Sequence, residues 1–283
     1  MRRGLIICAL VGISLATAAC GSGGGGAAKN GLLSVASAAS KTAGTKSARV
    51  HMDLSETVGF VGPLHIVGDG VSDNTTHSAD MTINLSAIAS LSGTQATNPD
   101  QWRARMILDG SGSSPLLYLR MPALNQYLSG KRWVKADLGA LAQKGGANLS
   151  QLLQTAGNED PTRALQLLES VGKVTRVGTA TIDGVDATEY TGSVDVKKAA
   201  AAAGSAYGKL LEQSKVTTIP VDVWIGSDGL VRRLREVFSY PVDGAQAATS
   251  LTLSLTDFGV QATITPPPAD QTVDYSTLKA LGG

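Results

Sequence analysis

The residue with the clearest chemical role in this sequence is Cys20, which closes the pattern of an export signal. Arg2 and Arg3 are basic, Leu5 to Leu15 is an apolar run too short to span a bilayer permanently, and residues 16–19 are small. A cleavage site ending in Ala-Ala-Cys is typical of lipoprotein processing, in which the cysteine sulfur takes a diacylglyceryl group and the freed amine takes a further chain such as palmitate. The sequence therefore predicts a lipoprotein signal peptide over residues 1–20 and lipid attachment at Cys20.

The alternative is an ordinary secretory signal that is cut nearby, with Cys20 an incidental thiol. Thr17 departs from the usual pattern, because lipoproteins commonly carry leucine three residues before the cysteine. The stretch after the cysteine favours lipid attachment, since Gly21 to Gly26 is flexible and would hold a domain clear of the membrane. Residues 21–30 are accordingly predicted to be a Gly-rich tether. Cys8 leaves with the signal, so the mature chain has a single cysteine and no internal disulfide.

Catalytic and metal-binding chemistry finds little support in the remaining residues. His51, His65 and His77 fall in or beside predicted strands without convergent partners, and we expect them to be solvated surface residues. The sequence contains no nucleophile elbow, phosphate-binding loop or zinc-protease motif, so we expect no enzyme, no catalytic residue, no cofactor and no metal. An envelope hydrolase with paired carboxylates is the least favoured alternative.

Charge argues against nucleic acid as a partner. The first 20 residues contain two arginines and no acidic residue, so the mature chain keeps 22 basic and 23 acidic residues, a net charge of −1. One local basic cluster comprises Arg232, Arg233 and Arg235. Its two interpretations are a solvated strand face that pairs with Asp222 and a contact for an anionic lipid headgroup.

Most of the mature chain has the period-two alternation of antiparallel strands with one dry and one wet face. Residues 48–55, 78–85 and 102–108 show this pattern, and Asp-Gly pairs at 183–184 and 228–229 predict hairpins, because both positions tolerate positive φ. The apolar face of these strands is long, aliphatic and rich in methionine, which suits an adaptable wall. A ligand cavity and a filled core are equally compatible with this periodicity. The predicted ligand-contacting residues are Val50, Met52, Leu54, Ile66, Met81, Ile83, Leu85, Met106, Leu108, Leu117 and Leu119.

Helical patterns interrupt the strands. Leu32 to Lys41 has one apolar stripe, Leu138 to Thr155 is leucine-rich, and Asp160-Pro161 is an N-cap followed by proline that opens a helix over residues 162–171. A further helix is predicted over residues 197–213, and residues 272–281 form a tail that folds back. The order is a first sheet section, a helical insert and a second sheet section, which together predict one domain over residues 31–283.

Several segments resemble the mycobacterial LppX/LprG-type lipoprotein family of the LolA-like superfamily. They follow the same order along nearly all of the mature chain, and each is largely a hairpin or strand signature. The segments are Leu116 to Pro122 with Lys131 to Lys135, Ile182 to Tyr190, Pro220 to Ile225 with Asp228 to Arg233, and Phe258 to Asp270.

This resemblance implies an α+β fold, in which a strongly curved antiparallel sheet, a LolA-like half-barrel, wraps over helices and encloses an apolar cavity for acyl chains. It implies a protein that carries or presents lipids or lipoglycans in the cell envelope, anchored through acylated Cys20 to the extracytoplasmic face of the cell membrane. A lipid or lipoglycan is then the ligand, and an envelope transporter is a further class of partner. The alternative is a non-enzymatic envelope scaffold or interaction lipoprotein with a filled core.

Overall fold

The computed structural model describes residues 26–58, 62–91, 98–143, 174–195, 197, 217–242 and 245–278. The predicted signal peptide, Cys20 and the first part of the tether lie outside these residues. So do the predicted helix over residues 162–171, most of the one over 197–213, and residues 144–155 of the leucine-rich stretch.

The described strands form one twelve-stranded sheet in the order β12-β6-β5-β4-β3-β2-β1-β11-β10-β9-β8-β7. The strand bounds are β1 Ser47–Val58, β2 Gly62–Asp73, β3 Ser78–Asn84, β4 Arg103–Asp109, β5 Leu116–Arg120, β6 Trp133–Asp137, β7 Thr175–Ile182, β8 Val185–Asp195, β9 Thr218–Gly226, β10 Val231–Val242, β11 Ala245–Thr256 and β12 Thr272–Asp274. Helices and 3-10 turns are α1 Gly26–Ala43, α2 Ser86–Leu91, η1 Pro99–Trp102, η2 Pro122–Tyr127, α3 Leu138–Gln143, η3 Ala269–Gln271 and α8 Tyr275–Leu278.

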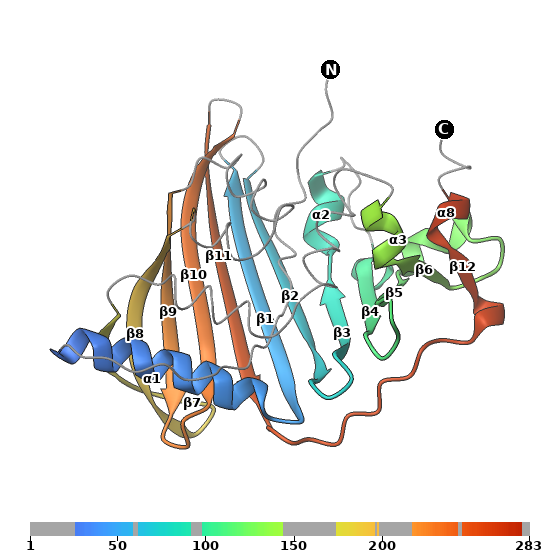
Figure 1. Ribbon diagram of the computed structural model, residues 1–283. Coiled ribbons are helices and arrows are strands. Elements are labelled where there is room, and N and C mark those ends of the chain that lie inside the picture. Colours follow the sequence, from blue (N-terminus) through green and yellow to red (C-terminus); the bar gives the residue numbers. More distant parts are fainter. Residues whose placement is uncertain are drawn as a thin grey trace.

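The sheet joins two meanders through the central neighbours β1 and β11. β1 to β6 follow one another in space, β7 to β11 do the same, and β1 pairs antiparallel with β11. Figure 1 shows the result as an open, curved sheet, whose two outermost strands, β7 and β12, lie at opposite edges. The predicted α+β class, with an open half-barrel sheet that is antiparallel in all but one pairing, is confirmed.

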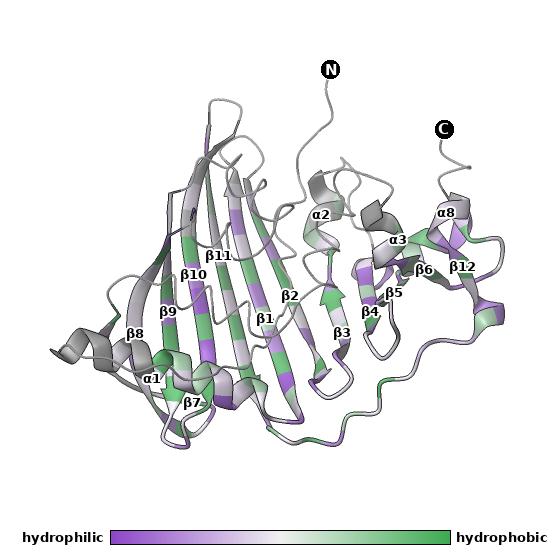
Figure 2. Cartoon of the chain, in the orientation of Figure 1, coloured by the Kyte–Doolittle hydropathy of each residue, from purple (hydrophilic) through white to green (hydrophobic). Residues whose placement is uncertain are grey.

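Alternation along each strand gives the sheet two chemically different faces. We call the face that carries Val50, Met52 and Leu54 the inner face, and the opposite one, with Arg49 and His51, the outer face. Figure 2 shows this alternation as green and purple bands along the central strands. Because a one-residue slip would exchange the two faces, burial of the inner one fixes the register of β1 against both of its neighbours.

Two helices pack on the inner face, α1 over the second meander and α2 over the first. Val35 and Ala38 of α1 join a buried cluster with Val223 of β9, while Ala87 of α2 packs against the cluster built on β1 to β3. Gly31 lets α1 approach closely, because a Cβ there would lie 2.9 Å from the carbonyl oxygen of Val174. None of the described helices is long and apolar enough to cross a membrane.

The beginning of α1 corrects the predicted tether. The helix starts at Gly26 rather than Leu32, so residues 26–30, which the sequence placed in the tether, are helical. Ala27, Ala28 and Lys29 are favourable helix formers, and no proline separates them from the rest of α1.

The two predicted Asp-Gly hairpins form, with different turns. Asp183 and Gly184 both have positive φ, at 48° and 79°. In the second hairpin only Gly229 has positive φ, at 74°, so Asp228 does not use the left-handed conformation that it tolerates. There the loop is longer, because the Gly226 amide donates to the Leu230 carbonyl, and a single left-handed residue closes it.

Two features of the C-terminal chain were not evident from alternation. Ile264 packs on the outer face against a buried cluster of Ile107, Tyr118 and Trp133, so part of this face is dry. The tail then folds back as predicted, and β12 pairs with β6, in parallel. Figure 1 shows the connecting segment running past the ends of β1 to β3 toward β12.

Candidate functional site

The eleven residues predicted to contact a ligand lie on the inner face, across β1 to β5 and the start of α2. Strand register places ten of them there: Leu54 lies opposite Ile66, Met81 opposite Met106, and the others fall on the same alternation. Leu85, between β3 and α2, packs against the same cluster. The structure therefore brings the predicted residues together, and their contact with a ligand stays a prediction.

Two glycines on β2 shape this surface. A Cβ on Gly68 would lie 3.2 Å from Ile83 Cγ1 and 3.4 Å from Met52 Cε. A Cβ on Gly70 would lie 2.4 Å from Met81 Sδ and 2.2 Å from the Asp80 carbonyl oxygen. The flexible side chains of Met52 and Met81 thus occupy positions where β2 has no side chain, which gives this part of the wall an adaptable surface.

Accessibility divides the predicted residues into two groups. Val50, Met52, Leu54, Ile66, Met81 and Ile83 are buried, with exposed fractions of 1–6%. The other five remain partly accessible although they point to the inner face, and they are Leu85, Met106, Leu108, Leu117 and Leu119. Apolar side chains of this second group could contact a bound molecule without displacing the buried ones.

The second meander extends the same apolar surface. Leu253 lies between Met52 of β1 and Leu234 of β10, and Leu251 lies beside Leu54. Leu234, Leu251 and Leu253 are all partly accessible. The sequence predicted that Leu251, Leu253 and Leu255 share one side of a strand, but it gave no signal that this side continues the face of β1.

Two carboxyl groups interrupt the apolar inner face. Glu56 on β1 is buried and lies beside Thr249 of β11, which is also buried. Glu236 on β10 lies opposite Leu251 and, on its other side, opposite Val221 of β9. Burial raises the pKa of the Glu236 carboxyl above its ordinary value. Sequence reasoning missed both residues; their even spacing with Leu54 and Leu234 was the available signal.

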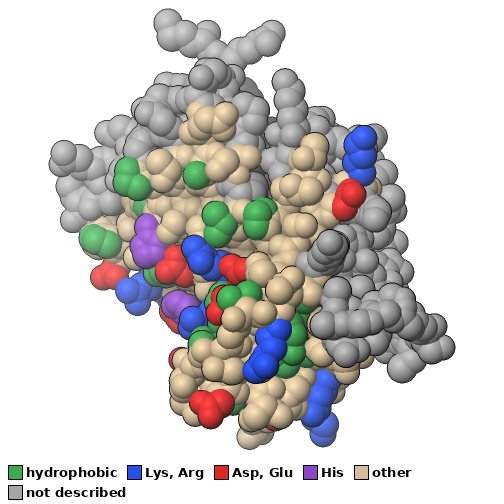
Figure 3. All heavy atoms as spheres, turned by 90° about the vertical axis from the view of Figure 1, so that its left-hand side faces the viewer, with side chains coloured by type: hydrophobic (Ala, Val, Ile, Leu, Met, Phe, Trp, Pro, Cys, Tyr) green, Lys and Arg blue, Asp and Glu red, His purple; other side chains and the backbone are tan. Residues whose placement is uncertain are grey.

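Ion pairs and histidines gather on the outer face. His51 Nδ1 lies 2.7 Å from Asp69 Oδ1, and His65 Nε2 lies 2.9 Å from Asp53 Oδ1. Both histidines are exposed, as predicted, and His77 is exposed in the turn after β2. Figure 3 shows histidine, basic and acidic side chains gathered on one side of the molecule. Within the described ranges, no group of three histidine, cysteine or acidic side chains could hold a metal ion.

Arg105 anchors a second polar group on the outer face. Its Nε lies 2.9 Å from Asp80 Oδ1 and its Nη2 lies 2.6 Å from Oδ2, while the guanidinium stands 5.8 Å from the centre of the Trp133 ring. Hydrogen bonding to Asp80 raises the pKa of Arg105. This bidentate pair bridges β3 and β4 and has a structural role.

In the basic cluster of β10, Arg233 and Arg235 lie on the outer face. Arg233 donates from Nε to Ser254 Oγ at 3.2 Å and lies over the Trp224 ring, while Arg232 pairs with Asp228 and stacks on Phe258. Beside them is an open hollow of about 440 Å³ with mixed charge. The hollow is lined by His51, Ile182, Asp183, Val185, Arg232, Arg233, Ser254, Thr256 and Asp257. It shares no residue with the predicted ligand-contacting set.

Comparison with known proteins finds related lipoproteins. No family model matches the chain. The chain is 34% identical to lipoprotein LprA of Mycobacterium tuberculosis over 109 residues, which cover 38% of this chain and 41% of LprA. It is 28% identical over 161 residues to an uncharacterised 31.2 kDa protein of Streptomyces griseus, covering 54% of this chain and 52% of that protein. The chain thus spans about half the length of the curated relatives it matches.

Comparison with solved structures finds similar chains at low sequence identity. The structure of LppX from Mycobacterium tuberculosis has a TM-score of 0.49 at 15% identity, and the match covers 84% of this chain and 99% of LppX. The structure of LprF from Mycobacterium bovis has a TM-score of 0.46 at 15% identity, and the match covers 85% of this chain and 98% of LprF. The similarity to LprA confirms the resemblance of this sequence to the mycobacterial LppX/LprG-type lipoproteins.

Proposed function

We propose that this protein is a membrane-anchored lipoprotein of the cell envelope that binds lipid acyl chains on its inner face. The observation that carries the proposal is the continuous apolar surface built from both meanders, on which Met106, Leu119, Leu234 and Leu253 remain partly accessible. Such a surface binds by burial of apolar area and needs no array of hydrogen bonds.

The energetics of lipid transfer suit this surface. Exposing an acyl chain of about sixteen methylenes to water costs about 13 kcal/mol, at about 0.8 kcal/mol per methylene. An aliphatic wall offsets most of this cost without chemical change in the ligand. We therefore propose a carrier or presenter of lipids or lipoglycans rather than an enzyme, with delivery to or from a transporter of the envelope as its further interaction.

The sequence at Cys20 and the similarity to the lipoprotein LprA support the proposed anchoring. Gly26, where α1 begins, lies six residues after Cys20, so a fully extended connection reaches about 20 Å. Two or three acyl chains on Cys20 would hold the protein stably on the extracytoplasmic face of the membrane. Conversion of Cys20 to Ala should move the full chain from the membrane fraction to the soluble fraction; retention in the membrane would contradict the anchor.

A second function has one observation in its favour. Six of the predicted ligand-contacting residues are buried, and all six pack in the cluster on β1 to β3, as in a filled core. A non-enzymatic envelope scaffold or interaction lipoprotein would need no accessible inner face. The two functions differ in whether lipid, beyond the covalent acyl groups, accompanies the purified protein.

Lipid bound to the full chain tests the proposal directly. The protein is purified in detergent from a lipoprotein-processing bacterial host, and bound lipids are identified by native mass spectrometry. We expect lipid on the wild type, its loss from Leu253→Gln on the inner face, and its retention by Thr252→Gln on the outer face of the same strand. Wild-type protein that repeatedly lacks bound lipid would overturn the proposal and favour the scaffold.

A further inference from the structure

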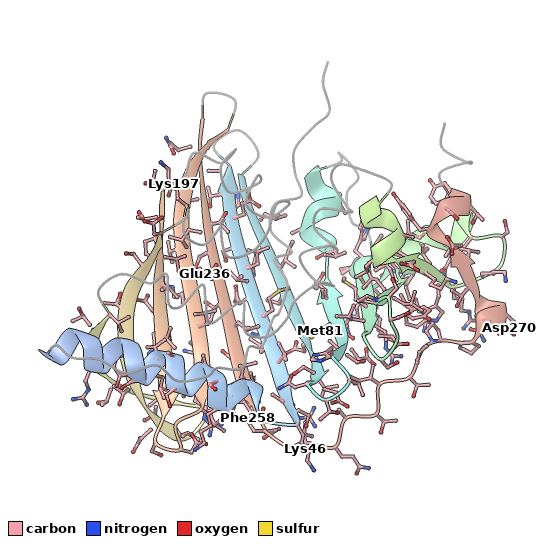
Figure 4. The ribbon with its side chains drawn as sticks, in the orientation of Figure 1. Lys46, Met81, Lys197, Glu236, Phe258 and Asp270 are labelled. Carbon is pink, nitrogen blue, oxygen red and sulfur yellow. The ribbon has the colours of Figure 1, made fainter. Side chains whose placement is uncertain are left out.

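Glu236 is a carboxyl group in the middle of an otherwise apolar section of the inner face. Figure 4 places it about halfway along β10. Its strand neighbour on the same face is Leu234, and its opposite neighbours are Leu251 of β11 and Val221 of β9. All three are apolar, so the strand register surrounds this carboxyl with aliphatic side chains.

No stabilising partner explains the presence of Glu236. Within the described part of the chain, its carboxyl has no hydrogen bond or ion pair, and desolvation is the cause of its raised pKa. Glu56, the other carboxyl of this face, differs because it does have an interaction partner. An unpartnered carboxyl in an apolar environment destabilises a protein, and groups of this kind are concentrated at functional sites.

Glu236 lies within the partly accessible section of the inner face. Taken as a whole residue, Glu236 is only partly buried, and so are its inner-face neighbours Leu234, Leu251 and Leu253. Glu236 and the aliphatic side chains that could contact an acyl chain therefore belong to one partly accessible surface, in which the carboxyl itself is desolvated. A protonated carboxyl can donate one hydrogen bond as well as accept, whereas the surrounding side chains can do neither.

We propose that Glu236 is the polar contact of the lipid site, where its carboxyl hydrogen-bonds an ester or hydroxyl oxygen of the ligand while the acyl chain lies along Leu234, Leu251 and Leu253. This inference rests on the proposed function and adds a ligand class to it. The ligand is an oxygen-bearing lipid whose acceptor oxygen enters the apolar face, not a pure hydrocarbon. The aliphatic residues supply affinity, and Glu236 selects chains with an acceptor oxygen at this depth.

Three probes of equal chain length separate these contributions. The full chain in nonionic detergent micelles is equilibrated with equimolar hexadecane, hexadecanol and methyl palmitate, then repurified, and the bound probes are quantified by gas chromatography and mass spectrometry. Glu236→Met is the main variant, because methionine is similar in length and apolar. Arg235→Met, on the outer face of the same strand, is its matched control, and Glu236→Gln restores a donor and an acceptor.

We expect the ratio of bound oxygenated probe to bound hexadecane to fall about 2- to 12-fold in Glu236→Met, the range for one neutral hydrogen bond. The Arg235→Met ratio should equal that of the wild type, and Glu236→Gln should recover most of the selectivity. A fall for methyl palmitate identifies an ester oxygen as the acceptor, and a fall for hexadecanol identifies a hydroxyl. Glu236→Met should also raise the thermal unfolding midpoint, because it removes an unpartnered carboxyl from an apolar surface.

Failure of this inference can be distinguished from failure of the proposed function. If the wild type and Glu236→Met bind the probes with the same ratio, Glu236 does not select the ligand, while lipid binding itself stands. If the wild type binds none of the three probes, the lipid-binding function fails and this inference fails with it. Glu236→Leu, measured in parallel, provides a second apolar variant should the methionine variant not fold.

Discussion

Thr42 ties α1, the helix that follows the predicted membrane anchor, to β10 of the sheet. Its hydroxyl donates to the Ala38 carbonyl at 2.7 Å and accepts from the Val231 amide at 2.8 Å. The side chain lies at the last turn of α1, and the residue is 1% exposed. Since Val231 begins β10, one buried hydroxyl satisfies a strand amide from the neighbouring helix.

Replacement of Thr42 by Val keeps the shape of the side chain and removes only this hydroxyl. The Val231 amide then remains buried without its acceptor, which costs about 1–3 kcal/mol. The added methyl group returns up to about 0.8 kcal/mol of apolar burial. The Ala38 carbonyl loses little, because within the helix it also accepts from the backbone. We therefore expect Thr42→Val to lower the free energy of unfolding by about 1–2 kcal/mol.

Urea unfolding of the wild type, Thr42→Val and Thr42→Ser measures this difference, and amide hydrogen exchange at Val231 localises it. The serine variant keeps the hydroxyl, so its Val231 amide should stay protected, whereas the valine variant should exchange faster. Equal protection of Val231 in both variants, or a valine variant as stable as the wild type, would refute the account of this contact.

Three further changes test other parts of the structure. Gly70→Ala should cost about 1–3 kcal/mol of unfolding free energy, because its Cβ would lie 2.2 Å from the Asp80 carbonyl oxygen, whereas Gly178→Ala, with nothing within 4 Å, should be nearly neutral by thermal unfolding. Arg105→Met should cost about 0.5–1 kcal/mol, and a double-mutant cycle with Asp80→Asn should recover this value as coupling. Hydrogen bonds from Ser114 and the Ala140 amide hold the pKa of Asp137 below its ordinary 3.8. The stabilisation from ionised Asp137 should therefore be complete above pH 3.8 and disappear as the pH falls through the lower pKa of the folded state, and Asp137→Asn should lack this part of the acid dependence in urea titrations at several pH values.

Alternation along the strands was enough to predict which side chains share a face within each meander. Val50, Met52 and Leu54 could be assigned to one side because successive side chains of a strand point to opposite faces, whatever the strand pairs with. The Asp-Gly hairpin at residues 183–184 was equally local, since its positive φ angles depend on residue type. The predicted inner face of β1 to β5 therefore followed from the sequence.

Only the tertiary structure decided which strands become neighbours. Pairing of β1 with β11 brings Leu54 beside Leu251, almost two hundred residues away, and so joins two apolar faces into one. Pairing of β10 with β9 and β11 places Glu236 between Val221 and Leu251, and the β1–β11 pairing extends this apolar surface to Leu54. The parallel pairing of β12 with β6 also depends on a contact between elements far apart in the sequence. Local periodicity assigns a side chain to a face, whereas the packing energy that selects among pairings involves residues far apart in the chain.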